Sequence, residues 1–154
     1  MATTNFDAVQ AAALAGTLTG DVTGNVTGNV TGNVTGQVNY TTVARTATAD
    51  GTGTGTIAAA GKLQFVTVTS DDANKIVILP APTPGTIVIL ANGATGYELR
   101  SSAPATVAID GGSGANAESA IAAATLVFAV CTSATTWQAI GLAGTTLAAV
   151  EAAA

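Results

Sequence analysis

The chain has 154 residues, which is enough for one domain of about 100 residues with appended segments. Charged residues make up 8% of the sequence, against about 25% in a typical soluble domain, and the formal net charge is −5. The four basic residues stand singly along the chain, so we expect no positive surface for nucleic acid. The longest nearly apolar run, Ala120 to Cys131, is shorter than the roughly 18 residues that span a membrane, so no membrane partner is expected.

Residues 1–17 contain a short Ala-rich segment with one apolar face. Phe6, Val9 and Ala13 would share that face in a helix. A helix of this length is marginal in isolation. We therefore expect an N-terminal anchor segment that becomes ordered on a larger surface, and a frayed terminus is the alternative.

Residues 18–38 repeat with a period of four. Leu-Thr-Gly-Asp is followed by Val-Thr-Gly-Asn three times, by Val-Thr-Gly-Gln and by Val38. A helix is disfavoured, because each interior glycine costs about 1 kcal/mol against alanine. Extended backbone fits better, since an even period keeps Leu18 and the valines on one face and Thr and Asn on the other. A small turn in each tetrad is a second reading that the pattern leaves open.

A single copy of this repeat has too little to bury. Its six aliphatic side chains supply on the order of 10 kcal/mol, whereas ordering its 21 backbone units costs roughly 20–40 kcal/mol. Its peptide groups would also lack partners along both edges. We therefore expect order only where other copies complete the core, and we predict an intertwined trimeric shaft over residues 18–38.

Residues 39–61 are rich in Thr, Ala and Gly, which predicts a linker or a thinner continuation of the shaft. The glycines suggest a phosphate loop at first sight. However, five residues separate Gly55 from Gly61, where a P-loop has four, and Leu63 stands where Ser or Thr would bind magnesium. A nucleotide site is therefore not expected.

Residues 62–144 read as an all-β domain, a small antiparallel β-sandwich or barrel. In the first expected strand, Leu63–Thr69, apolar residues fall on both faces, so both faces are expected to be covered. Phe65, Phe128 and Trp137 are the expected bulky members of the core. After the domain, residues 145–154 form an Ala-rich C-terminal tail, either a helix or an arm. The expected strands are Leu63–Thr69, Ile76–Leu79, Thr86–Leu90, Tyr97–Arg100, Thr106–Ile109, Thr125–Cys131 and Thr136–Ile140.

The residues offer little chemistry. The chain has no histidine, which removes the usual catalytic triads and metal sites. Cys131 is the only cysteine and is expected to be a small buried hydrophobe. Asp71 and Asp72 are adjacent and would point to opposite faces of a strand, so a glycosidase pair is not expected, and Asp71, Asp72 and Asp110 lack the spacing of a calcium loop. We predict no catalytic, cofactor or metal site, no cofactor, and a protein that is not an enzyme.

The repeat and part of the β domain resemble a known class. The run of tetrads from Leu18 resembles tandem repeats in tail fibres and capsid-attached proteins of tailed bacteriophages. The blocks Gly61–Val68, Ile76–Pro80 and Ala115–Ser119 are similar to small virion proteins of marine and cyanobacterial phages. The resemblance implies a trimeric virion structural protein and supplies no family site residues.

These patterns lead to two functional expectations. The first is a homotrimeric capsid decoration (cement) protein, located on the capsid exterior, that binds the major capsid protein and stabilises the head. The second is a head or tail fibre, an adhesin that binds a host surface glycan. Tyr40, Tyr97 and Trp137 are the aromatic residues that could stack on a sugar, although Trp137 is expected in the core.

Overall fold

The computed structural model describes residue 40, residues 42–142 and residues 151–152. The chain divides into two compact units, Met1–Gly36 and Gln37–Ala154, and the described residues belong to the second. The expected anchor (1–17) and the expected trimeric shaft (18–38) lie outside the described residues. In the part of the chain that is described, no helix has the length and apolar character needed to cross a membrane.

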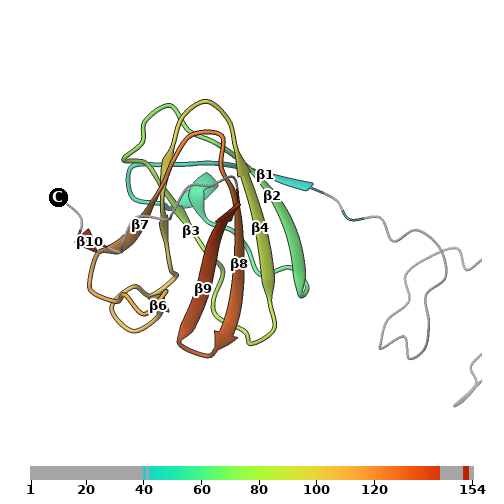
Figure 1. Cartoon of the computed structure of the whole chain (residues 1–154), viewed down its shortest axis with the longest axis vertical. Helices are drawn as coiled ribbons and strands as arrows, with labels where there is room; N and C mark the ends of the chain where they lie inside the picture. The colour runs from blue at the N-terminus through green and yellow to red at the C-terminus, as the bar shows by residue number, and fades with distance from the viewer. Residues whose placement is uncertain (1–39, 41, 143–150, 153–154) are drawn as a thin grey trace, which may run out of the picture. The chain divides into compact units, whose positions relative to one another are not determined.

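The described chain is all-β, as the sequence predicts, and its strands form two sheets (Figure 1). A single 3₁₀ turn, η1 (Gly53–Gly55), follows the first strand. The six-stranded sheet has the spatial order β1 (Thr42–Thr46), β2 (Leu63–Thr69), β4 (Ile87–Asn92), β8 (Leu126–Ser133), β9 (Thr136–Leu142) and β6 (Ala108–Ile109). The four-stranded sheet has the order β10 (Glu151–Ala152), β7 (Ala117–Ile121), β5 (Tyr97–Arg100) and β3 (Ile76–Ile78).

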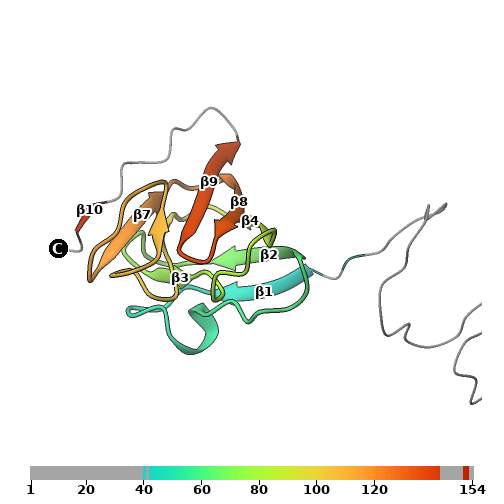
Figure 2. The same cartoon turned by 90° about the horizontal axis from the view of Figure 1, so that it is seen from below.

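Both sheets mix parallel and antiparallel pairs, so the expectation of an antiparallel domain is wrong. β1 is parallel to β2, β2 to β4, β6 to β9 and β3 to β5, while β4, β8 and β9 form an antiparallel series. The chain crosses to the other sheet between β2 and β4, where it forms β3, and it then returns beside β2 in the same direction (Figure 2). Such crossovers produce parallel neighbours.

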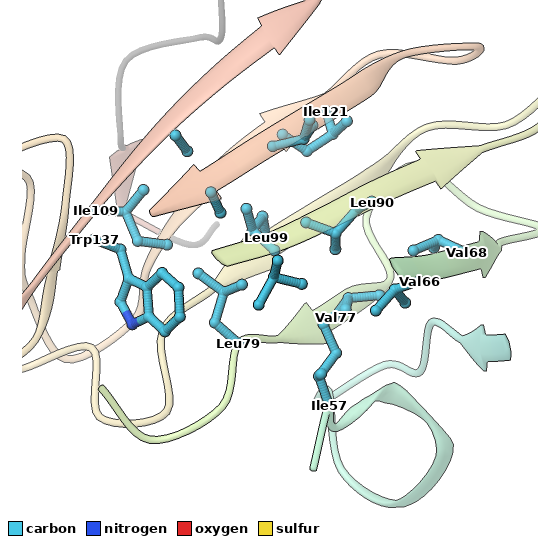
Figure 3. Close-up of a cluster of buried hydrophobic side chains, with 14 of the residues drawn as sticks. Ile57, Val66, Val68, Val77, Leu79, Leu90, Leu99, Ile109, Ile121 and Trp137 are labelled. Atoms are coloured by element: carbon cyan, nitrogen blue, oxygen red, sulfur yellow. The ribbon is translucent and has the colours of Figure 1, made fainter. Parts of the chain in front are cut away.

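The core lies between the two sheets, whose buried side chains form one cluster (Figure 3). Trp137 on β9 is its largest member and is fully buried, which confirms the prediction for this residue. Cys131 on β8 is also buried, as predicted. The other labelled members in Figure 3 are Ile57, Val66, Val68, Val77, Leu79, Leu90, Leu99, Ile109 and Ile121.

Phe65 and Phe128 are not in this core, and the prediction for them is wrong. Both side chains are half-buried on the opposite face of the six-stranded sheet. Adjacent residues of a strand point to opposite faces. Because Val66 and Val127 fill the core, their neighbours Phe65 and Phe128 must point away from it.

The segment expected as a linker, 39–61, is largely part of the β domain. β1 pairs with β2, and the buried residues Ala47 and Ile57 belong to the core cluster. Thr48 and Ile76 exchange two backbone hydrogen bonds of 3.1 and 2.7 Å. Gly51 has a φ of +77°, and a Cβ there would lie 2.7 Å from the Ile76 side chain, so only glycine fits this turn. The low-complexity composition therefore hides an integral part of the fold.

The end of the chain also contributes to the fold. β10, within the expected tail 145–154, pairs antiparallel with β7, and Glu151 and Ala152 lie opposite Glu118 and Ala117. This pairing places β10 at one edge of the four-stranded sheet. Part of the tail is thus a strand rather than the helix or free arm that the sequence left open.

Asp110 fastens the turn after β6 to β9. Its Oδ1 accepts a hydrogen bond of 2.8 Å from the backbone N–H of Ala139, and its own N–H donates to the Trp137 carbonyl. Desolvation raises the pKa of the Asp110 carboxyl above its ordinary value, and the Ala139 N–H partly opposes this shift. Its φ of 51° is a conformation that Asn and Asp tolerate better than most residues.

We expect Asp110→Asn to remove a pH dependence of stability. A raised carboxyl pKa in the folded state means that Asp110 supports folding most below its ordinary pKa and progressively less as the pH rises through the raised value. Asparagine keeps the acceptor for Ala139 and does not titrate. The free energy of unfolding of the variant, relative to wild type, should therefore increase in urea titrations as the pH rises from below the ordinary aspartate pKa of 3.8 toward neutral. A difference that stays constant over this range would contradict the assignment.

Candidate interaction surface

The face of the six-stranded sheet that points away from the core is apolar. Its central row crosses four neighbouring strands: Phe65 lies opposite Ile89, Ile89 opposite Phe128, and Phe128 opposite Ile140. Side chains paired in this way lie about 5 Å apart and contact one another. We call this surface the outer apolar face, and it comprises Leu63, Phe65, Ile87, Ile89, Leu126, Phe128, Val130, Ile140 and Leu142.

The outer apolar face carries no charge. In the six described strands of this sheet the only charged residue is Arg45, and Arg45 pairs with the core residue Val68, so its position belongs to the other face. The polar positions that flank the central row are Thr67 and Gln138. A charged partner would therefore find no complementary group here and would have to bury its charge unpaired. An apolar partner would avoid this cost of desolvation.

The two ends of the face are its most exposed parts. Ile140 is 60% exposed and Leu142 is 48% exposed, both on β9. At the other end, the ring of Tyr40 lies against Phe65 with centroids 5.6 Å apart, and Tyr40 is itself 54% exposed. Monomeric proteins rarely expose continuous apolar surface across several strands. The outer apolar face is therefore the candidate interaction surface of the described residues.

The aromatic residues considered for sugar binding do not come together. Trp137 and Tyr97 are buried in the core, and burial raises the pKa of the Tyr97 hydroxyl. Tyr40 alone among the three is exposed, and one side of its ring is near Phe65. The described residues therefore bring no pair of these aromatic rings together for a sugar.

The acidic residues considered for a metal or an acid pair each have a different interaction partner. Asp71 forms an ion pair of 2.6 Å with Lys75, and the hydrogen bond from Lys75 lowers the pKa of its exposed carboxyl. Asp72 Oδ1 accepts a bond from the Asn74 N–H in the same turn, while Asp110 binds Ala139. Among the described residues, no group of three or more His, Cys, Asp or Glu side chains could hold a metal ion.

Cys131 offers no reactive thiol in this environment. It is buried, burial raises the pKa of its thiol, and its Sγ lies 3.1 Å from the Ser133 carbonyl oxygen. A thiol in this state is a poor nucleophile. The residue acts as a core side chain.

Sequence reasoning did not single out Ile140 or Leu142, although one signal pointed to their face. The double-sided apolar pattern of Leu63–Thr69 predicts cover on both sides of that strand.

Comparisons of the chain with family models, with curated proteins and with solved structures give no match.

Proposed function

We propose that the protein is a structural virion protein, a homotrimeric capsid decoration (cement) protein on the capsid exterior that binds the major capsid protein. The observation that carries the proposal is the outer apolar face, which includes the exposed side chains of Leu126, Ile140 and Leu142. The tetrapeptide repeat, which a single chain lacks the apolar surface to order, supports it independently. Two separate regions of one chain therefore call for association with further copies.

The proposed mechanism is stabilisation of the shell by preferential binding. A trimer that contacts adjoining major capsid subunits adds buried area across their junctions. Because it binds the assembled shell better than free subunits, it shifts the assembly equilibrium toward the shell. Saturation at about 100 times the dissociation constant contributes about 2.7 kcal/mol per site.

Removal of the protein from phage heads should make the heads burst more easily. We expect stripped heads to release DNA at a lower temperature than intact heads, because the added contacts across capsid junctions are lost. Thermal release followed with a DNA dye measures the effect, and re-addition of the purified full chain should restore the original temperature. Equal release temperatures for stripped and intact heads would contradict a cement function.

The alternative is a head or tail fibre that binds a host surface glycan. The exposed ring of Tyr40 is the observation that favours it, since aromatic rings stack on sugars. Copy number separates the two functions. A number on the scale of the capsid subunits supports decoration, and a few copies at the tail support a fibre.

A further inference from the structure

We infer that three copies of the chain contact one another through the outer apolar face, with the Tyr40 end of one copy against the Ile140 end of the next. The inference rests on the proposed homotrimer. It assigns the surface that holds the β domains together and the residues at each side of the contact. Three observations carry it: the position of Tyr40 at one end of the face, what threefold symmetry requires, and the size and charge of the face.

The first described residue after the repeat, Tyr40, lies at this face. Tyr40 follows the last valine of the repeat, Val38, by two residues, and its ring packs on Phe65. β1 then begins at Thr42, directly opposite Phe65 on β2. The chain therefore enters the described β domain beside the outer apolar face.

Threefold symmetry requires two different contact regions on each copy. In a ring of three, one patch meets a different patch on the neighbour, because only a twofold axis lets a patch meet itself. The outer apolar face has two such regions, the Tyr40 end and the β9 end with Ile140 and Leu142. These three side chains are 54%, 60% and 48% exposed. A contact of one end with the other covers the most exposed apolar side chains of the face together.

The size and charge of the face fit a second copy as its occupant. The row from β2 to β9 crosses three strand spacings, about 14 Å, and strands of seven residues are about 23 Å long. The outer side of these four strands, including the polar positions Thr67 and Gln138, thus covers roughly 300 Å², which is less than half of what each side of a standard interface buries. The repeat of the same chain can supply the remainder. A second copy also offers an equally chargeless surface, which leaves no ion unpaired at the contact.

The test is Ile140→Lys in the full chain, with Ala73→Lys as the matched control. Ile140 is mostly exposed in one copy, so lysine should leave the fold of that copy unchanged, but at a contact its ammonium must be desolvated. Ala73 is exposed in the turn between β2 and β3, so Ala73→Lys adds the same charge outside the outer apolar face. Sedimentation velocity over a dilution series should show at least a tenfold rise in the half-dissociation concentration for Ile140→Lys alone. The emission maximum of Trp137 verifies that each variant is folded.

The outcomes separate this inference from the proposed function. A wild-type trimer that Ile140→Lys weakens and Ala73→Lys does not supports the assigned surface. If both variants dissociate at the same concentration as a wild-type trimer, the outer apolar face is not the contact between copies, and the proposed homotrimer is unaffected. A wild-type chain that is monomeric at all concentrations overturns the homotrimer and the inference together.

A cysteine pair tests how the two ends meet. Disulfide formation needs Cα atoms within about 7 Å, which excludes a bond between the two ends of the face in one copy, about 14 Å apart. Oxidation of the Tyr40→Cys, Ile140→Cys double variant should therefore link copies up to a covalent trimer on a non-reducing gel. Each single variant should stop at a dimer or below. A double variant that also stops there would overturn the end-to-end contact.

Discussion

Replacement of Trp137 by alanine is expected to lower the free energy of unfolding by about 3–5 kcal/mol. The side chain is fully buried, and its strand neighbours at this position are Cys131 on β8 and Ile109 on β6. Loss of the indole removes the largest apolar group of the core and leaves a cavity between the sheets. Trp137→Phe fills part of that cavity and should cost less.

Urea unfolding followed by circular dichroism measures this effect, since the variant lacks the only tryptophan. Protein concentration must be equal in all samples, because association makes apparent stability depend on it. Asn74→Ala is the control: it lies in an exposed turn outside β9 and should change the free energy by no more than about 0.5 kcal/mol. A loss below about 1 kcal/mol for Trp137→Ala would show that the domain core lies elsewhere.

The strands that the sequence predicts best are those with their own strong pattern. The expected ranges Leu63–Thr69 and Tyr97–Arg100 are confirmed as β2 and β5 without a change of bounds. Both combine β-branched or aromatic residues with turn residues on their flanks. In such segments local preference and tertiary structure agree, so the sequence is sufficient.

β7 could not be predicted, because its order comes from its neighbours. Ala117–Ile121 is Ala-Glu-Ser-Ala-Ile, which contains several residues that are depleted in strands. Pairing with β5 aligns Glu118 with Arg100, and their side chains form an ion pair of 2.5 Å that is largely shielded from solvent. β1 is similar, since its partner β2 orders a segment whose composition resembles a linker.

The sequence did not reveal the outer apolar face, because it does not show which residues of β9 point into the core. On β9, Trp137 and Ala139 point into the core, so Ile140 and Leu142 must point away from it. A small alanine thus lies inside while a large isoleucine lies outside, contrary to the usual distribution. Only the structure reveals this inversion, which puts two large apolar side chains at the contact that we propose between copies.

Asn92 fastens the two loops that cross between the sheets at one end of the domain. Its Nδ2 donates hydrogen bonds of 2.9 Å to the carbonyls of Thr95 and Ala122, and its Oδ1 accepts one of 2.9 Å from the Thr125 N–H. Thr95 belongs to the loop from β4 to β5, and the other two residues belong to the loop from β7 to β8. A backbone hydrogen bond of 2.7 Å from the Ala124 N–H to the Gly93 carbonyl also joins the two loops.

Asn92→Ala should therefore lower the free energy of unfolding by about 2–4 kcal/mol, because two carbonyls and one N–H lose their partner in a partly buried site. Asn92→Asp has nearly the same shape and keeps the acceptor for Thr125, but it turns an oxygen toward both carbonyls. Its loss at neutral pH should be at least as large as that of Asn92→Ala.

Urea unfolding followed by Trp137 fluorescence measures both variants, with Asn74→Ala in an exposed turn as the control. An Asn92→Asp chain as stable as wild type would show that the two donated bonds contribute nothing. If the predicted order holds, the Asn92 side chain adds to the backbone hydrogen bond of 2.7 Å from the Ala124 N–H to the Gly93 carbonyl, which joins the same two loops. Asn92→Ala should then lower the free energy of unfolding while Ile140 and Tyr40 stay as in wild type. This separates the stability of one copy from the contact between copies.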